Sequence, residues 1–196
     1  KSSINRAPKK KTDGKKGEDF WIWLQLKVIA DVGIIGLPNA GKSSLLAALS
    51  RARPKIASYP FTTINPNLGV VYYDNKEITL ADIPGLIEGA HKGVGLGDKF
   101  LRHVERCKAL LHLIDITEEN LVESYKKVRL ELTAYDKSLS KKKEIILFNK
   151  TDLIDKIEVS KKINNFKNKM KKRCQAISLF TKQDINMIKK SLKMSC

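Results

Sequence analysis

The chain of 196 residues is 42% apolar, which is enough to bury the core of one domain and excludes disorder throughout. No apolar run reaches the 18 residues that a membrane-spanning helix needs, and three cysteines without CxxC spacing argue against a disulfide framework and a cysteine-built zinc site. The net charge of +17 is concentrated toward the ends, because residues 21–136 carry 14 bases and 13 acids whereas residues 137–173 carry 13 and four. The excess is mostly lysine, which indicates either contact with a polyanion without base reading or a compositional habit of the source genome.

Residues 1–19 have almost no apolar content and predict a mobile basic leader. They lack the apolar segment of a secretory signal peptide, and the acidic residues Asp13, Glu18 and Asp19 argue against an organelle transit sequence. We therefore expect an intracellular, cytoplasmic protein, with the mitochondrial or plastid matrix as the alternative. The expected domains are residues 1–30, a leader with one strand, and residues 31–196.

From residue 20 onward, apolar runs of strand length alternate with segments of helical period. Strands are expected at residues 23–30, 32–36, 69–73, 78–82, 110–115, 145–149 and 175–178. Helices are expected at residues 42–50, 97–106, 121–135, 159–170 and 183–193, and residues 138–143 are expected to form a solvated loop. This alternation predicts an α/β fold, a mostly parallel sheet with helices on both faces.

Residues 36–43 match the pattern GxxxxGK[ST] between an expected strand and an expected helix. Glycines let the backbone turn its N–H groups toward phosphate oxygens, and the helix N-terminus adds positive potential. Lys42 is expected to reach the β- and γ-phosphates, and the Ser43 hydroxyl is expected to bind Mg²⁺. A glycine-rich turn that binds nothing is disfavoured by the correctly placed strand and helix. The nucleotide contacts expected here are Gly36, Leu37, Pro38, Asn39, Ala40, Gly41, Lys42, Ser43 and Ser44.

A second motif begins at the end of the strand expected at residues 78–82. Asp82 opens the DxxG sequence Asp82, Ile83, Pro84 and Gly85, and an acidic residue at such a strand end is the usual further route to Mg²⁺ in a phosphate-loop enzyme. DxxG alone is a common turn, but after a phosphate loop it predicts a switch whose glycine N–H turns toward the γ-phosphate.

A third motif, Asn149, Lys150, Thr151 and Asp152, ends the apolar strand at residues 145–148. It resembles the NKxD base-recognition motif of GTPases, in which the Asp accepts hydrogen bonds from guanine while Asn and Lys frame the ring. Adenine offers no matching donor pair and would leave the carboxylate buried and unpaired. Ser178 and Leu179 follow the last expected strand and resemble the fifth GTPase motif, which usually has alanine where Leu179 stands.

The segments between these motifs narrow the resemblance from GTPases in general to one family of them. Residues 59–63, 66–71, 85–91 and 93–97 resemble switches I and II of the Obg family of ribosome-associated GTPases, and residues 5–8 and 21–33 resemble the end of that family's glycine-rich N-terminal domain. The resemblance covers nearly the whole chain and implies a P-loop NTPase G domain. GTPases of the DRG type share some switch elements and are the alternative.

The resemblance also implies roles for the switch residues. Mg²⁺ would be held by Ser43, Thr63 and Asp82, switch I would contact GTP through Phe61, Thr62, Thr63 and Ile64, and the catalytic groups would be Lys42, Thr63 and Gly85. Leu86 stands where small GTPases have the glutamine that orients water, so we expect slow hydrolysis. K⁺ held near Asn39 could replace an arginine finger.

These observations favour a Mg²⁺-dependent, slow GTP hydrolase that switches between GTP and GDP states and acts as a monomer on the large ribosomal subunit or its rRNA. A P-loop ATPase or nucleotide kinase is disfavoured, because it should lack NKxD and carry a lid of arginines. A non-hydrolysing RNA-binding module that uses the lysine-rich C-terminal part stays open. Of the histidines, His103 and His112 are expected to pack within a helix and a strand, and His91 lies in the switch region.

Overall fold

The computed structural model describes residues 14–22, 30–50, 55–56, 67–82, 107–135 and 137–195. The switch segments other than residues 67–71, the helix expected at residues 97–106 and most of the strand expected at residues 23–30 lie outside these residues. Within the described leader, Trp21 is fully exposed. The domain boundary near residue 30 stays a prediction.

Among the described residues, seven strands form one sheet in the order β2-β3-β4-β1-β5-β6-β7. β1 pairs in parallel with β4 and β5, β5 with β6, and β6 with β7. The mostly parallel sheet is thereby confirmed. The strand bounds are β1 Ala30–Ile35, β2 Lys55–Ile56, β3 Asn67–Tyr73, β4 Lys76–Asp82, β5 Cys107–Asp115, β6 Lys143–Asn149 and β7 Cys174–Ala176.

β3 departs from the parallel pattern, because it pairs antiparallel with β2 on one side and forms an antiparallel hairpin with β4 on the other. Asp74 and Asn75 connect β3 to β4 with positive φ angles of 52° and 58°. Two residues in this conformation match the twist of a tight hairpin, whereas a parallel connection needs a crossover of a dozen residues or more. The hairpin therefore follows from the short connection, and β4 begins two residues earlier than expected.

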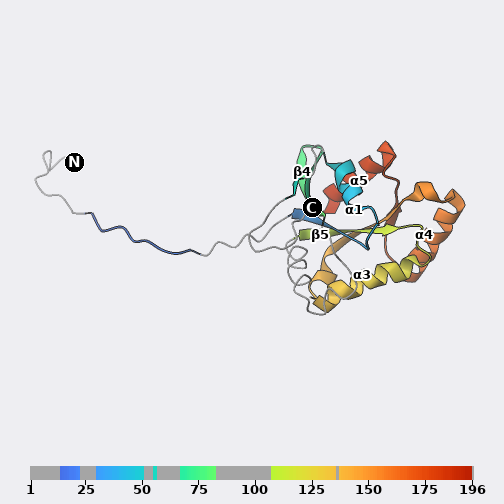
Figure 1. Cartoon of the computed structure of the whole chain (residues 1–196), viewed down its shortest axis with the longest axis horizontal. Coiled ribbons are helices and arrows are strands. Elements are labelled where there is room, and N and C mark those ends of the chain that lie inside the picture. The colour runs from blue at the N-terminus through green and yellow to red at the C-terminus, as the bar shows by residue number, and fades with distance from the viewer. Residues whose placement is uncertain are drawn as a thin grey trace, which may run out of the picture.

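The helices lie on both faces of the sheet, as expected. α1 (Lys42–Leu49) and α5 (Lys182–Ser195) bury leucines and isoleucines with β1 and β5, while α3 (Leu121–Tyr135) and α4 (Lys156–Met170) cover the opposite face. Figure 1 shows these two pairs on either side of β5. At the start of α3, Asn120 caps the helix: its Oδ1 accepts from the Glu123 N–H at 3.3 Å, and its Nδ2 donates to Glu123 Oε2 at 3.2 Å.

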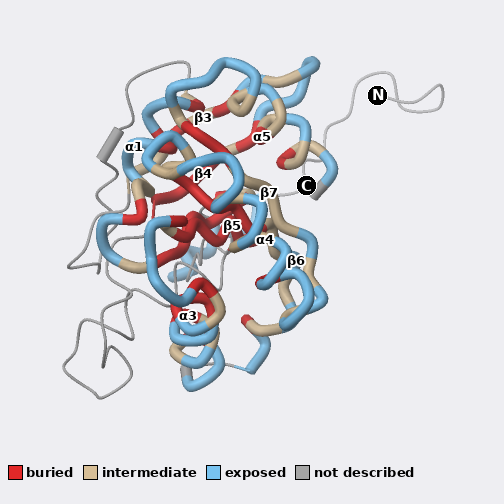
Figure 2. The backbone as a smooth tube through the Cα atoms, turned by 90° about the vertical axis from the view of Figure 1, so that its right-hand side faces the viewer, coloured by how far each residue is buried: buried red, intermediate tan, exposed pale blue. Residues whose placement is uncertain are grey.

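The tube in Figure 2 shows that buried positions follow the central strands and the inward sides of the helices, while their outer sides are exposed. Residues 138–143, expected as a solvated loop, contain the 3₁₀ turn η2 (Leu139–Lys141) and the first residue of β6. The loop expectation was wrong at Leu139, whose apolar side chain is fully buried with Val128 and Leu132 of α3. Among the described helices, none is long and apolar enough to cross a lipid bilayer.

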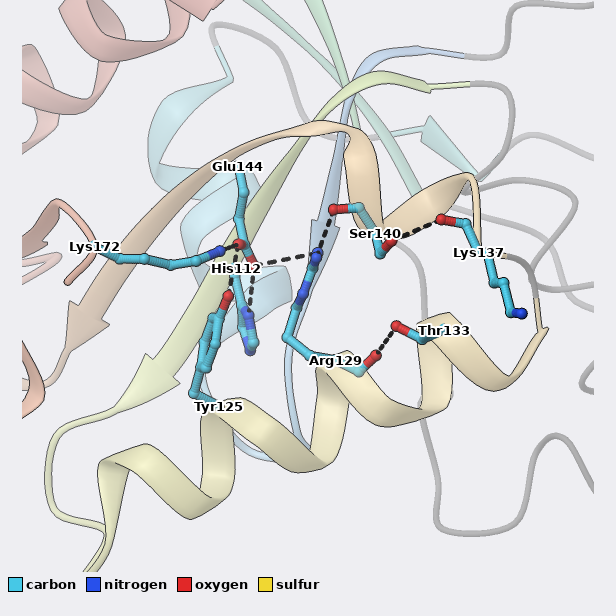
Figure 3. Close-up of polar contacts among 8 residues, drawn as sticks. All are labelled: His112, Tyr125, Arg129, Thr133, Lys137, Ser140, Glu144 and Lys172. Atoms are coloured by element: carbon cyan, nitrogen blue, oxygen red, sulfur yellow. Dashed lines mark hydrogen bonds and ion pairs between the residues drawn. The ribbon is translucent and has the colours of Figure 1, made fainter. Parts of the chain in front are cut away.

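A buried polar cluster joins β5, α3 and β6 (Figure 3). Glu144 Oε1 lies 3.1 Å from His112 Nδ1, and Glu144 Oε2 lies 2.9 Å from both the Tyr125 hydroxyl and Lys172 Nζ. Burial by itself raises the pKa of Glu144, but His112, Lys172 and Arg129 lower it to about 2. Burial also lowers the pKa of His112, which is fully enclosed. His112 thus packs inside the fold, as expected.

Candidate functional site

The loop between β1 and α1 has the backbone conformation that its glycines permit. Gly36 and Gly41 have φ angles of 152° and 94°, and Asn39 is left-handed at 62°. A Cβ on Gly36 would lie 2.2 Å from the carbonyl oxygen of Leu113 in β5. Glycine is therefore required here for both backbone conformation and close packing. The loop ends directly at the N-terminus of α1, where backbone N–H groups are free to bind an anion.

Lys42, the first residue of α1, reaches back over this loop. Its ammonium donates to the carbonyl oxygens of Gly36 at 3.1 Å and Leu37 at 3.0 Å. Burial lowers the pKa of Lys42, and the nearby Asp82 carboxylate opposes this shift. The loop carbonyls thus hold a partly desolvated cation at the mouth of the phosphate loop.

Ser43 and Asp82, the two described residues of the expected Mg²⁺ site, are brought together from α1 and the end of β4. The Ser43 hydroxyl donates to Asp82 Oδ2 at 2.6 Å. Asp82 is 2% exposed, and its Oδ1 has no hydrogen-bond partner among the described residues. A buried carboxylate oxygen without a donor, beside a hydroxyl, fits a hard cation. The described residues contain no cluster of three His, Cys, Asp or Glu side chains, so a cation here would also need oxygens from a phosphate or water.

The NKxD residues follow β6 and lie beside the phosphate loop. Asn149 is buried, and its Nδ2 donates to the carbonyl oxygen of Ala40 at 3.0 Å. A Cβ on Gly41 would lie 2.5 Å from the same nitrogen, so this glycine makes room for the contact. The two motifs, separated by more than 100 residues in the sequence, are therefore joined by one buried hydrogen bond.

Lys150 adopts a left-handed conformation, with φ of 67°, and its ammonium lies 2.5 Å from Asp115 Oδ2 at the end of β5. Asp115 Oδ1 accepts from the backbone N–H and the hydroxyl of Thr117 at 2.9 and 2.7 Å. Burial alone would raise the pKa of Asp115, but Lys150 and Thr117 lower it below its ordinary value. Sequence reasoning assigned Asp115 no role, although its place at the end of an apolar strand is a signal that could have identified it.

Asp152 is exposed, and its Oδ1 accepts from the Ser178 hydroxyl at 2.8 Å. The Ser178 N–H donates in turn to Asp184 Oδ2 in the first turn of α5 at 2.8 Å, a contact that sequence reasoning also missed. Leu179 packs its side chain against the core. The structure therefore places the expected fifth motif next to the expected base-reading carboxylate.

Of the expected site residues, the structure thus assembles the phosphate loop, Asp82, Asn149, Lys150, Asp152, Ser178 and Leu179 at the carboxyl ends of the parallel strands. Phe61, Thr62, Thr63, Ile64, Ile83, Pro84 and Gly85 lie outside the described residues, as do Leu86 and His91. Ser44 is exposed on α1. Ligand sites of open α/β sheets lie at this edge.

Comparisons with known proteins identify the family. Residues 31–150 match the family described as "50S ribosome-binding GTPase". The GTPase Obg of Pelagibacter ubique is 62% identical over 192 residues, which is 98% of this chain and 59% of that protein. The chain therefore spans somewhat more than half the length of this relative.

Solved structures with the same fold include the G domain of the T. maritima FeoB iron transporter, with a TM-score of 0.61 and 22% identity over 84% of this chain and 96% of that chain. Era in complex with MgGDPNP and nucleotides 1506–1542 of 16S ribosomal RNA gives a TM-score of 0.61 and 25% identity over 84% and 56% of the two chains. The matched region contains the phosphate loop, Asp82 and the start of NKxD, which the fold assembles into one site. The chain belongs to the 50S ribosome-binding GTPase family and, within it, to the Obg GTPases.

Proposed function

We propose that this chain is a Mg²⁺-dependent GTP hydrolase that works as a slow nucleotide switch in the assembly of the large ribosomal subunit. The observation that carries the proposal is the hydrogen bond between Asn149 and Ala40, because it places the expected base-binding motif against the expected phosphate loop. A nucleotide that spans both motifs meets phosphate ligands at one end and base ligands at the other.

The phosphate end is supported by the geometry of the loop and Lys42. The left-handed glycines turn the loop toward the N-terminus of α1, and the Lys42 ammonium can exchange its two carbonyl partners for phosphate oxygens. Ser43 and Asp82 would hold Mg²⁺, which when bound neutralises phosphate charge. The family resemblance adds Thr63 as a further ligand and the Gly85 N–H as a donor to the γ-phosphate.

The base end is supported by the side chains around Asp152. The Ser178 hydroxyl donates to one oxygen of this carboxylate and orients it. The backbone N–H of Ser178 donates to the Asp184 carboxylate, which holds Ser178 in place. A carboxylate selects guanine because only guanine presents two adjacent donors to it, while adenine leaves it unpaired.

Slow hydrolysis is proposed from Leu86, which offers no polar group to orient an attacking water. Asn39 is exposed in the phosphate loop, which is compatible with a side-chain oxygen that helps hold K⁺ beside the phosphates. The test is turnover in K⁺ against Na⁺, in the wild type and in Asn39→Asp. Equal rates in both salts and both proteins would remove K⁺ from the proposal.

The family description "50S ribosome-binding" supports the large subunit as partner, and the bacterial relatives support a cytoplasmic place of action. That the chain acts as a monomer is part of the proposal. Titration of labelled GDP, GTP and ATP, with and without EDTA, tests the nucleotide assignment. We expect guanine nucleotides to bind, ATP to fail, and Lys42→Ala to abolish binding. Lys76→Ala, an exposed lysine on the β3–β4 hairpin, is the matched control and should bind as the wild type does. Unchanged GTP affinity in Lys42→Ala would contradict the site assignment.

Association with the large subunit tests the switch. Purified large subunits should co-sediment with the protein in a non-hydrolysable GTP analogue to a different extent than in GDP. Equal association in both nucleotides would refute the switch while leaving the nucleotide site intact.

A further inference from the structure

Positive charge is unevenly distributed among the surface helices. Residues 156–173, which form α4 and its connection to β7, contain eight bases and one acid, whereas the neighbouring α3 contains three bases and two acids. A bias in the amino-acid composition of the source genome would enrich both helices in lysine to the same degree. The bases of this segment are Lys156, Lys161, Lys162, Lys167, Lys169, Lys171, Lys172 and Arg173.

Most of these bases have no carboxylate partner in the part of the chain that the structure describes. Lys162 pairs with Glu158 at 3.5 Å, and Lys172 pairs with Glu144 at 2.9 Å. The other six are exposed and form no ion pair with any residue that the structure describes. Lys167 and Lys169 lie in the last turn of α4, where cations stabilise the helix dipole, but this accounts for two of the six. Like charges gathered without partners disfavour folding, so a role outside the fold is indicated.

A groove of about 420 Å³ borders this segment, between the end of α4, β7 and the end of α5. Lys167 and Arg173 line it together with Gln175 and Ser191, whose side chains hydrogen-bond at 3.0 Å. Glu144 is the one carboxylate among its lining residues. The side chains in Figure 3 show that this charge is directed into the buried cluster, where Lys172, Arg129 and Tyr125 surround it. The rim of the groove is therefore basic.

The chemistry of this rim favours phosphodiester groups of RNA. Seven of the eight bases are lysines, which bind phosphate as point charges and lack the planar fork that reads base edges. Ile188 and Leu192 of α5 are buried in the core, so Met194 is the exposed large apolar side chain at the groove, and a single such side chain is too little apolar surface to favour a membrane over RNA. Glu144 and Cys174 put the groove at the amino ends of β6 and β7, the sheet edge opposite to the nucleotide site.

We propose that the α4 surface, defined as this groove and the unpaired bases at the C-terminal end of the segment, Lys167, Lys169, Lys171 and Arg173, binds the sugar-phosphate backbone of RNA without reading its sequence. The inference rests on the proposed function, since it assigns a contact surface for the ribosomal partner. Because the surface lies opposite to the nucleotide site, its contribution to RNA affinity is the same in GDP and in GTP.

The test is the salt dependence of binding to a short fluorescein-labelled RNA duplex of random sequence, measured by anisotropy on the 196-residue chain. The variant combines Lys167→Gln, Lys169→Gln and Arg173→Gln. Each phosphate contact contributes about 0.9 to the slope of log affinity against log salt, so the slope should fall by about 2 to 3. The matched control combines Lys76→Gln, Lys126→Gln and Lys137→Gln, which neutralise three exposed lysines elsewhere, and should keep the wild-type slope.

Equal slopes for the α4 variant and the control would overturn the inference. Loss of binding to phosphatidylglycerol vesicles or to a polyglutamate peptide, without loss of binding to the duplex, would also overturn it in favour of another partner. Circular dichroism and GTP affinity should be unchanged in both variants, because all six positions are exposed and remote from the phosphate loop.

Failure of this inference is distinguishable from failure of the switch. Suppose that the α4 variant keeps the wild-type salt dependence of RNA binding, while association with the large subunit still differs between GTP and GDP. Then only the assignment of RNA binding to the α4 surface is wrong. If the variant loses RNA affinity while association ignores the nucleotide, the surface stands and the switch is wrong.

Discussion

Asp115→Asn is the sharpest test of how the base-binding motif is held. In the wild type, Asp115 Oδ2 accepts from the Lys150 ammonium at 2.5 Å, while Oδ1 is held by Thr117. The substitution keeps the size of the side chain and removes its charge. Lys150 loses the partner that orients its stem, so the guanine site is less preorganised and the affinity for GDP falls.

The magnitude follows from the burial of the pair. Hydrogen bonds to charged groups contribute about 1.5–3 kcal/mol, and exposure reduces this. The side chain of Lys150 is 32% exposed and that of Asp115 is 14% exposed, so we take the lower end of the range. A loss of about 1.4 kcal/mol raises the dissociation constant of GDP about tenfold.

A double-mutant cycle with Lys150→Met separates this role from general destabilisation. Methionine keeps an apolar stem and lacks the ammonium, so Asp115→Asn should change GDP affinity less than about twofold in that background. Thr117→Val removes one hydroxyl bond to Oδ1 and leaves the ion pair intact, so it serves as the control. Thermal unfolding of the nucleotide-free proteins shows whether the fold itself has changed.

Additive effects of Asp115→Asn and Lys150→Met on GDP affinity would refute the reasoning, because they would show that Asp115 does not act through Lys150. A Thr117→Val effect as large as that of Asp115→Asn would do the same, since it would assign the effect to the loop rather than to the ion pair.

Three further predictions concern the cluster around Glu144, the base-reading carboxylate and the joint between the two motifs. In the fold, the pKa of Glu144 is lowered from an ordinary 4.5 to about 2. Each unit by which a pKa is lowered corresponds to about 1.36 kcal/mol, so ionisation of Glu144 contributes about 3 kcal/mol to the free energy of unfolding. Because the folded-state pKa is the lower one, this stability is present above pH 4.5 and is lost as the pH falls toward 2. Urea unfolding should therefore show an acid-dependent loss that is smaller by about 3 kcal/mol in Glu144→Gln, in which Asp115 and Asp31 still titrate; identical pH profiles would contradict it. Asp152→Asn replaces the acceptor of the guanine donors with an amide and should shift preference from GTP toward XTP; competition binding measures this, and unchanged preference would exclude Asp152 from base reading. Gly41→Ala places a Cβ 2.5 Å from Asn149 Nδ2 and imposes a strained φ of 94°. Strain and lost contact of about 1–3 kcal/mol should lower GTP affinity about 5- to 150-fold in the same assay; wild-type affinity would show that the hydrogen bond joining the two motifs is dispensable.

The sequence alone predicted the mostly parallel α/β fold, the two helical layers and the residues of the phosphate loop. These features are local: apolar runs of strand length, helical periods, and glycines whose backbone conformation is set by the absence of a Cβ. The pairing direction of β3 was not recognised, although the signal was present in the two-residue connection at Asp74 and Asn75.

Only the tertiary structure decided which distant side chains meet. It joined Asn149 to Ala40, Lys150 to Asp115, and Ser178 to Asp152, and it turned the charge of Glu144 inward beside a basic groove. Such contacts depend on strand order and register, through which the sheet aligns residues that are far apart in the chain, and no local pattern encodes them. The sequence therefore determined which chemical groups are available, and the order of the strands determined which of them act together.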